Sequence, residues 1–126
     1  MGGTPKEKIL NESKLLLYKK FYDFTLWLTN HTGKFPKSHR FSYSVKLESL
    51  LIDTLFQINR ANNAKVKDKY FPAIDRNLDE IEILLRLSKD LKFINFTSYE
   101  FAFRSMDEIR KIFGGWSKKF QREIPK

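Results

Sequence analysis

The stretch in which one helical pattern gives way to the next reads Gly33-Lys34-Phe35-Pro36-Lys37-Ser38-His39-Arg40-Phe41. These nine residues hold two aromatic residues, one proline and three cations, with no acid. Glycine permits left-handed backbone and proline lacks an N–H, so both favour a helix end here. A connection between helices does not need this much charge. We therefore expect a corner that sets how two helices pack and that also contacts an anion.

Apolar residues recur at three- and four-residue spacing on both sides of this corner, which is the pattern of amphipathic helices. The spacing predicts helices over Ser13–His31, over Ser38–Asn62 and within Lys67–Leu91. Pro72 must lie in the first turn of the third helix or just before it, because an interior proline costs about 3 kcal/mol. Asn62-Asn63 is expected to end the second helix, since asparagine tolerates left-handed backbone.

The fourth helix carries a start signal of its own. Thr97-Ser98-Tyr99-Glu100 matches the capping box, in which a hydroxyl is followed three residues later by a carboxylate. Helical spacing then continues to Trp116, and Gly114-Gly115 weakens the C-terminal end. No useful alternating strand pattern appears. We expect an all-α, up-down four-helix bundle over residues 13–120, with a disordered leader at 1–12 and a basic tail at 121–126.

Aromatic bulk exceeds what one small bundle is expected to bury. The chain has twelve Phe among 126 residues. The surplus around the third connection and the fourth helix consists of Phe93, Ile94, Phe96, Phe101, Phe103 and Phe113. Either the core is unusually aromatic, or other subunits cover an apolar face, and we favour oligomerisation.

The charge balance favours a polyanionic partner. The chain has 24 Lys and Arg against 15 Asp and Glu, a net charge of +9 and a pI near 9.8. Nucleic acid is the favoured partner over an acidic membrane surface, and the alternative is that the charge serves solubility alone. The chain has no cysteine, which excludes disulfides and thiolate metal sites and fits the cytoplasm. No apolar run is long enough to span a bilayer.

Cations gather in three clusters along the sequence. They are Lys34, Lys37, Arg40 and Lys46 at the first corner, Arg86, Lys89 and Lys92 on the third helix, and Lys118 and Lys119 with Arg122 and Lys126 at the C-terminus. Lysine and arginine bind phosphates and release counterions from them. All three clusters are candidate nucleic-acid or partner contacts, although each taken alone is equally explained as a solvated basic face.

No catalytic constellation is found. His31 and His39 have no Cys, His or carboxylate nearby at metal-ligand spacing, so no metal or cofactor is expected. Acids such as Asp79-Glu80 alternate with arginines at helical spacing, which favours solvated ion pairs. Helical ribonucleases of the HEPN type place an Arg four to six residues before a His, and neither histidine has one. We expect no enzyme; a helical nuclease using His31 or His39 is the alternative.

Several short motifs in order resemble a known family. These are Phe35-Pro36-Lys37-Ser38-His39-Arg40-Phe41, then Leu87-Ser88-Lys89-Asp90-Leu91-Lys92, then Tyr99 and Gly114-Gly115-Trp116. Over residues 14–119 the chain resembles the accessory variability determinant (Avd) proteins of diversity-generating retroelements. The 23S rRNA intervening-sequence proteins share the first motif but continue with a Pro-Ser-Asn-Ile-Ala-Glu-Gly-like stretch. Here that region is Leu50-Leu51-Ile52-Asp53-Thr54-Leu55, which points towards Avd.

The resemblance implies more than the residues themselves indicate. It implies a homopentamer of four-helix bundles, which forms a basic barrel with a central channel. It also implies binding to the retroelement reverse transcriptase and to template-repeat RNA, and support of mutagenic cDNA synthesis without chemistry of its own. The setting would be a bacterial cytoplasm, with the gene carried by the bacterium or a phage. The alternative is an intervening-sequence protein that binds rRNA.

Overall fold

The computed structural model describes the backbone of residues 5–123 and the side chains of residues 15–39 and 42–118. It has four long helices, α1 (Pro5–Thr32), α2 (Val45–Asn63), α3 (Phe71–Asp90) and α4 (Phe96–Glu123). Short turns lead into two of them: η1 (Lys37–His39) and η2 (Arg40–Ser44) precede α2, and η3 (Lys67–Tyr70) precedes α3. Residues 5–123 contain no strand. The prediction of an all-α fold with four helices is confirmed.

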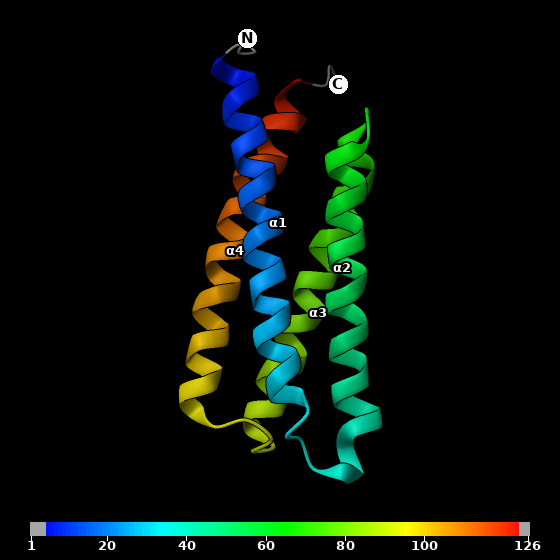
Figure 1. Cartoon of the computed structure of the whole chain (residues 1–126), viewed down its shortest axis with the longest axis vertical. Helices are drawn as coiled ribbons and strands as arrows, with labels where there is room; N and C mark the ends of the chain where they lie inside the picture. The colour runs from blue at the N-terminus through cyan, green and yellow to red at the C-terminus, as the bar shows by residue number, and fades with distance from the viewer. Residues whose placement is uncertain (1–4, 124–126) are drawn as a thin grey trace.

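The helices form an up-down bundle in which consecutive helices run in opposite directions (Figure 1). α1 packs against α2 and α4, and α3 packs against the same two helices. The α1–α2 and α3–α4 connections therefore lie at one end of the bundle, and the α2–α3 connection lies at the other (Figure 1). The expected pentamer stays a prediction, because the structure contains one chain.

Each helix buries one apolar stripe, because residues three and four apart share a face of a helix. The buried stripes are Leu17, Phe21, Phe24 and Leu28 on α1; Leu47, Leu50, Leu51 and Ile58 on α2; Ile74, Leu78, Ile81 and Leu85 on α3; and Ala102, Met106, Ile109, Phe113 and Trp116 on α4. Full burial of one such large side chain stabilises the fold by about 1.5–3 kcal/mol relative to exposure. The sequence spacing predicts most of these residues, but it also places Val45 on the α2 stripe and Leu87 and Leu91 on the α3 stripe, and those three side chains are exposed.

The first helix is longer than predicted and ends differently. α1 begins at Pro5, so residues 5–12, where a disordered leader was expected, are helical; residues 1–4 lie outside the described part. Gly33 does not adopt the left-handed backbone that was expected there, since none of the described glycines has a positive φ. Instead the chain leaves α1 through short turns, in which the Lys34 N–H donates to His31 O and the Phe35 N–H donates to Thr32 O.

The start of the second helix also differs from the prediction. Regular α-helix begins at Val45 rather than Ser38, after the η1 and η2 turns. Hydrogen bonds to the end of α1 hold this start in place: Ser44 Oγ donates to Thr32 O (3.1 Å), and Thr32 Oγ1 donates to Glu48 Oε1 (2.8 Å). Both Thr32 and Ser44 are buried. The buried hydroxyls therefore fix the corner between α1 and α2.

The second helix stops near the predicted position by another mechanism. α2 ends at Asn63, and Ala64 is extended, with no left-handed asparagine in the described part. The Lys67 ammonium group instead donates to the carbonyls of Ala61 (3.1 Å), Asn62 (2.9 Å) and Ala64 (3.2 Å). A lysine near a helix C-terminus satisfies carbonyls that have no partner within the helix.

The third and fourth helices give one confirmation and one correction. Pro72 lies in the first turn of α3, as predicted. α4 begins at Phe96, so the predicted capping box at Thr97 is wrong; the Asn95 side chain accepts from the Ser98 N–H (2.7 Å) and serves as the cap. The helix continues through Gly114-Gly115 to Glu123 and takes in residues 121–123 of the expected tail, while residues 124–126 lie outside the described part.

Within the described residues, no helix combines the length and apolar character that crossing a bilayer requires.

Candidate nucleic-acid interface

An aromatic cluster joins the two connections at one end of the bundle. The ring of Phe93, in the α3–α4 connection, lies 5.5 Å from the ring of Phe35, 4.6 Å from that of His39 and 5.3 Å from that of Tyr43. The last three belong to the α1–α2 connection. Ring pairs at such distances contribute about 0.5–1.5 kcal/mol each beyond their buried area. The two connections therefore form one surface.

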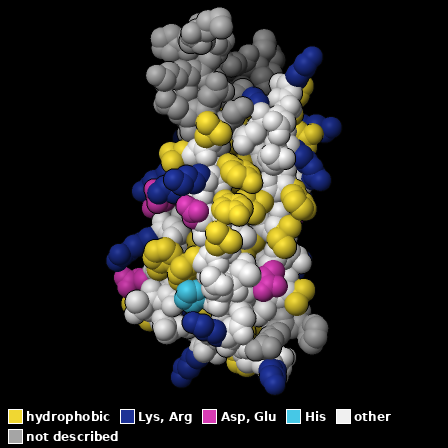
Figure 2. Space-filling view, in the orientation of Figure 1, with side chains coloured by type: hydrophobic (Ala, Val, Ile, Leu, Met, Phe, Trp, Pro, Cys, Tyr) yellow, Lys and Arg dark blue, Asp and Glu magenta, His cyan; other side chains and the backbone are white. Residues whose placement is uncertain are grey.

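This surface brings together cations from two of the three sequence clusters. We call it the basic end and define it by Lys34, Lys37, Lys46, Lys89 and Lys92. Figure 1 places the connections and helix ends that carry these residues at the same end of the molecule, and dark-blue side chains project there in Figure 2. Sequence spacing does not indicate that the clusters around residues 34–46 and 89–92 meet, because 43 or more positions separate them.

Most of these ammonium groups are free of carboxylates. Lys34, Lys37, Lys46 and Lys92 are exposed, and none makes an ion pair with a described residue. Lys89 is half-buried; its Nζ lies 3.5 Å from Asp90 Oδ1 and 4.6 Å from the centre of the Tyr99 ring. Unpaired like charges in one region raise the local positive potential, which favours a polyanion.

Lys92 has an unusual backbone. Its φ is 65°, the one positive φ found for a non-glycine residue in the described part of the chain. The Phe93 N–H donates to Ser88 O (2.8 Å) and the Lys92 N–H donates to Lys89 O (2.9 Å), which is the Schellman pattern at the end of α3. Lys92 thus occupies the position at which glycine is usual.

The other predicted contacts lie elsewhere or outside the described side chains. Arg86 lies about one helical turn before Lys89 on α3, where it lines a groove against α4. Lys118 is exposed near the C-terminal end of α4, at the opposite end of the bundle (Figure 1). The side chains of Arg40 and Lys119 lie outside the described residues, although the backbone of Arg40 opens η2. The third cluster is therefore separate from the first two.

Sequence reasoning missed two cations beside that third cluster. Lys65 and Lys69 are exposed in the α2–α3 connection, at the same end as Lys118 (Figure 1). The Lys69 Nζ lies 5.8 Å from the centre of the Tyr70 ring. The signal in the sequence is the lysine at every second position, 65, 67 and 69. This signal is weak, because Asp68 adds a negative charge and Lys67 caps α2.

Both histidines have packing roles. His31 Nδ1 lies 2.9 Å from Trp27 O, and the two rings are 4.0 Å apart. His39 packs on Phe93 within the aromatic cluster. Among the described residues, no three His, Cys, Asp or Glu side chains are placed to hold a metal ion.

Acidic side chains of α3 meet a single arginine of α4. Arg110 binds Glu82 (Nε to Oε1, 2.6 Å), Asp79 and Asp75 (3.4 Å). Burial by itself would lower the pKa of Arg110, but the hydrogen bond to Glu82 and the three negative charges outweigh it and raise that pKa. The alternation of acids and arginines in the sequence predicted ion pairs; the structure shows that this one joins two helices.

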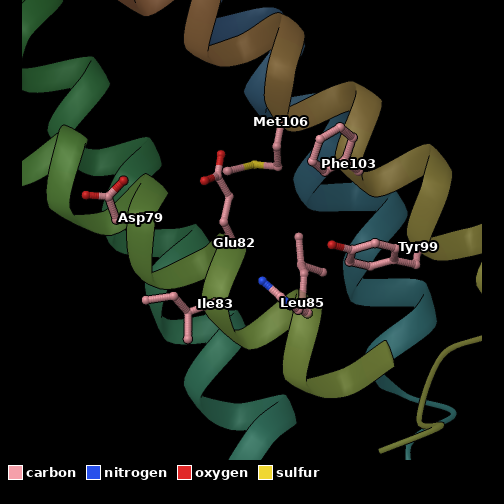
Figure 3. Close-up of a pocket in the computed structure, with 8 residues that line it drawn as sticks. Asp79, Glu82, Ile83, Leu85, Tyr99, Phe103 and Met106 are labelled. Atoms are coloured by element: carbon pink, nitrogen blue, oxygen red, sulfur yellow. The ribbon is translucent and has the colours of Figure 1, made fainter. Parts of the chain in front are cut away.

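Among the described side chains, exposed apolar residues form a surface on α1 and α2 and a groove between α3 and α4. The first, which we call the α1–α2 surface, appears in Figure 2 as yellow side chains over those helices and comprises Leu15, Tyr18, Tyr22, Leu26, Val45, Ile52 and Phe56. The second is a groove of about 420 Å³ between α3 and α4, shown in Figure 3. Ile83 and Phe103 line this α3–α4 groove and are 60% and 59% exposed. Apolar surfaces of this kind mark contacts with a partner.

The surplus of aromatic and other apolar side chains divides between core and surface. Phe113 and Ile94 are buried and Phe93 is half-buried, whereas Phe96, Phe101 and Phe103 are exposed. The core alone therefore does not take up the aromatic bulk noted in the sequence.

Comparison with known proteins gives one match. Residues 15–120 match the model of a protein family described as bAvd-like. No curated protein and no solved structure matches the chain.

Proposed function

Because the chain belongs to the bAvd-like family, we propose that it is the non-catalytic accessory protein of a diversity-generating retroelement. In this proposal it binds the retroelement reverse transcriptase and template-repeat RNA, and so supports mutagenic cDNA synthesis. The family match covers most of the chain and agrees with the order of motifs in the sequence. The basic end is the proposed RNA contact.

The observation that carries the RNA part of the proposal is the convergence of unpaired cations on one end of the bundle. Lys34, Lys37, Lys46 and Lys92 come from two connections that an aromatic cluster joins. If each neutralises one phosphate of a single strand, affinity falls with salt with a log–log slope of about −3. Raising the salt concentration from 50 to 200 mM would then weaken RNA binding about 50-fold in total, for the four contacts together.

The test is a salt titration of RNA binding with a matched control. Lys34→Gln/Lys37→Gln removes two cations from the basic end, and Lys65→Gln/Lys69→Gln removes two exposed cations from the opposite end. Fluorescence anisotropy with labelled template-repeat RNA should show a slope reduced by about 1.4 for the first variant and little change for the second. Equal slopes for both variants, or no binding by the wild type at 50 mM salt, would refute the proposed contact.

The polymerase part of the proposal needs its own experiment. The tagged reverse transcriptase of the same retroelement should retain the purified chain, and template-repeat cDNA yield should rise when the chain is added. The chain alone should leave RNA uncut. A chain that neither binds the polymerase nor changes cDNA yield would refute an accessory role; RNA cleavage that His31→Ala or His39→Ala abolishes would instead establish a nuclease.

We also propose the homopentamer. Its support is that the two exposed apolar surfaces differ, since one lies on α1 and α2 and the other on α3 and α4. Pairing one surface with the other on the next copy is a heterologous contact, and such contacts close into rings when the rotation allows. Light scattering should give a mass of about five times the 15.1 kDa chain.

Paired interface variants test this arrangement. Phe56→Glu disrupts the α1–α2 surface and Phe103→Glu disrupts the α3–α4 groove; these rings are 55% and 59% exposed. Each variant alone should be monomeric. A mixture of the two should give a dimer, because one intact contact remains between an undamaged α1–α2 surface and an undamaged groove. A pentamer that survives either change, or a mixture that stays monomeric, would refute the pairing.

A further inference from the structure

Lys92 has left-handed backbone at the end of α3. A residue with a Cβ is strained at φ 65°, whereas glycine is not, and the Schellman turn at the end of α3 requires this conformation. The two hydrogen bonds of the turn use backbone groups alone, from Lys92 and Phe93 to Lys89 and Ser88. Glycine could make both of them, so the turn itself gives no reason for a lysine.

Contacts within the chain give no reason either. The Lys92 side chain is exposed, and its ammonium group makes no hydrogen bond or ion pair with any residue whose side chain the structure describes. The two backbone hydrogen bonds of the turn hold Lys92 in the strained conformation, and residues held in this way cluster at functional sites. The turn accounts for the backbone but not for the lysine side chain, which is exposed to a partner outside this chain.

The position of Lys92 indicates the chemistry of that partner. Its neighbour Phe93 packs on Phe35, the neighbour of Lys34 in the other connection (ring centres 5.5 Å apart). Consecutive Cα atoms are 3.8 Å apart, so the ring contact brings the two lysine-bearing segments together. Unpaired ammonium groups repel one another, and an anion with several charges removes that repulsion.

We propose that the two connections form one composite site for consecutive phosphates of an RNA strand, and that Lys92 is a phosphate contact retained at the cost of fold stability. This inference rests on the proposed RNA binding and goes further, because it names the residue, the ligand groups and a conflict between stability and binding. Lys34 and Lys37 supply the cations from the α1–α2 side of the site, and Lys92 supplies the cation from the α3–α4 side.

The experiment uses one substitution with two opposite effects. Lys92→Gly relieves the left-handed strain and should raise Tm by about 4 °C. It also removes one phosphate contact, so RNA affinity should fall about eightfold at 50 mM salt and about threefold at 200 mM, and the log–log slope should decrease by about 0.7. Lys92→Arg keeps both the charge and the strain, and should leave Tm and the slope near the wild-type values.

Lys92→Asn is a second variant, since asparagine tolerates left-handed backbone and carries no charge. It should show the same loss of slope as Lys92→Gly. The inference is overturned if Lys92→Gly lowers Tm, or if both uncharged variants bind RNA like the wild type at every salt concentration. In the latter case the wild type still binds RNA, so the proposed RNA binding would be retained and only the role of Lys92 in it would be refuted.

A competition experiment separates an RNA strand from isolated phosphate. Unlabelled RNA should displace labelled RNA from the wild type, and inorganic phosphate at matched ionic strength should not. Equal competition by inorganic phosphate would overturn the site for consecutive phosphates. A wild type that binds no RNA at 50 mM salt would overturn the proposed RNA binding itself, and the rise in Tm of Lys92→Gly would then report strain alone.

Discussion

Replacing Phe93 by alanine should separate the two connections at the basic end. Phe93 makes ring contacts to Phe35, His39 and Tyr43, and no other described aromatic residue links these two connections. Its N–H also donates to Ser88 O at the end of α3, a bond that alanine retains. The substitution thus removes the side-chain link and leaves the turn.

The expected loss follows from this geometry. Truncation of a fully buried Phe to Ala costs about 3–5 kcal/mol, and a half-buried ring about half as much. The three ring contacts contribute at least about 0.5 kcal/mol each. Part of this contribution is already included in the cost of truncating Phe to Ala. We expect about 2–3 kcal/mol, or a Tm lower by about 8 °C for a chain of this length.

The assay is thermal unfolding by circular dichroism at one fixed protein concentration, because oligomers unfold at concentration-dependent temperatures. Phe96→Ala is the matched control: it is the same truncation three residues further on, at a ring that is 66% exposed, and it should change stability by less than about 0.5 kcal/mol. RNA affinity at 50 mM salt should fall for Phe93→Ala alone. Equal Tm values for the two variants would refute the idea that Phe93 joins the connections.

Three other predictions concern the helices. Arg110→Met should lower the free energy of unfolding by about 1 kcal/mol in urea unfolding, since it leaves three carboxylates without their cation. Because the pKa of Arg110 is raised in the folded state, Arg110 contributes its full stabilisation below the ordinary arginine pKa and loses it only as the pH rises through the folded-state pKa. The substitution should therefore destabilise the protein equally at pH 7 and pH 10. Asn95→Ala should lower the free energy of unfolding by about 1 kcal/mol in the same assay, and Thr97→Ala should lower it much less. A larger loss for Thr97→Ala would show that Thr97, and not Asn95, caps α4. Gly114→Ala and Gly115→Ala should each raise stability by about 0.5–1 kcal/mol in thermal unfolding, since a Cβ at either position meets no atom within 4 Å; destabilisation would contradict the open space there.

The helical pattern could be predicted because it depends on local periodicity. Residues that recur at three- and four-residue spacing, such as Leu17 and Phe21, are buried as the spacing requires. Pro72 could be placed for a similar reason, since a proline in a helix interior loses a hydrogen bond and clashes with the preceding turn.

Helix ends were predicted less well, because competing groups lie within a few residues of one another. Asn95 and Thr97 are both good caps, and which of them accepts a backbone N–H depends on where the chain enters α4. Asn63 ends α2 without left-handed backbone because Lys67, four residues on, reaches back to the carbonyls. In the sequence, Thr97 matches the pattern of a helix cap as well as Asn95 does, although Thr97 lies two residues beyond the true cap of α4.

The amino-acid sequence alone is enough to predict the helical class, most of each buried stripe, the positive charge and, through motif order, the family to which the chain belongs. These properties depend on residue identity and on short spacings. The three-dimensional fold is needed to see that Lys34 and Lys92 share one end of the bundle, that Lys118 lies at the other, and that Lys92 has left-handed backbone. Antiparallel packing brings the first and third connections together in space, although α2 and α3 separate them in the sequence. A contact between residues so far apart, such as that of Phe35 with Phe93, produces no periodic pattern in the sequence and so cannot be predicted from it.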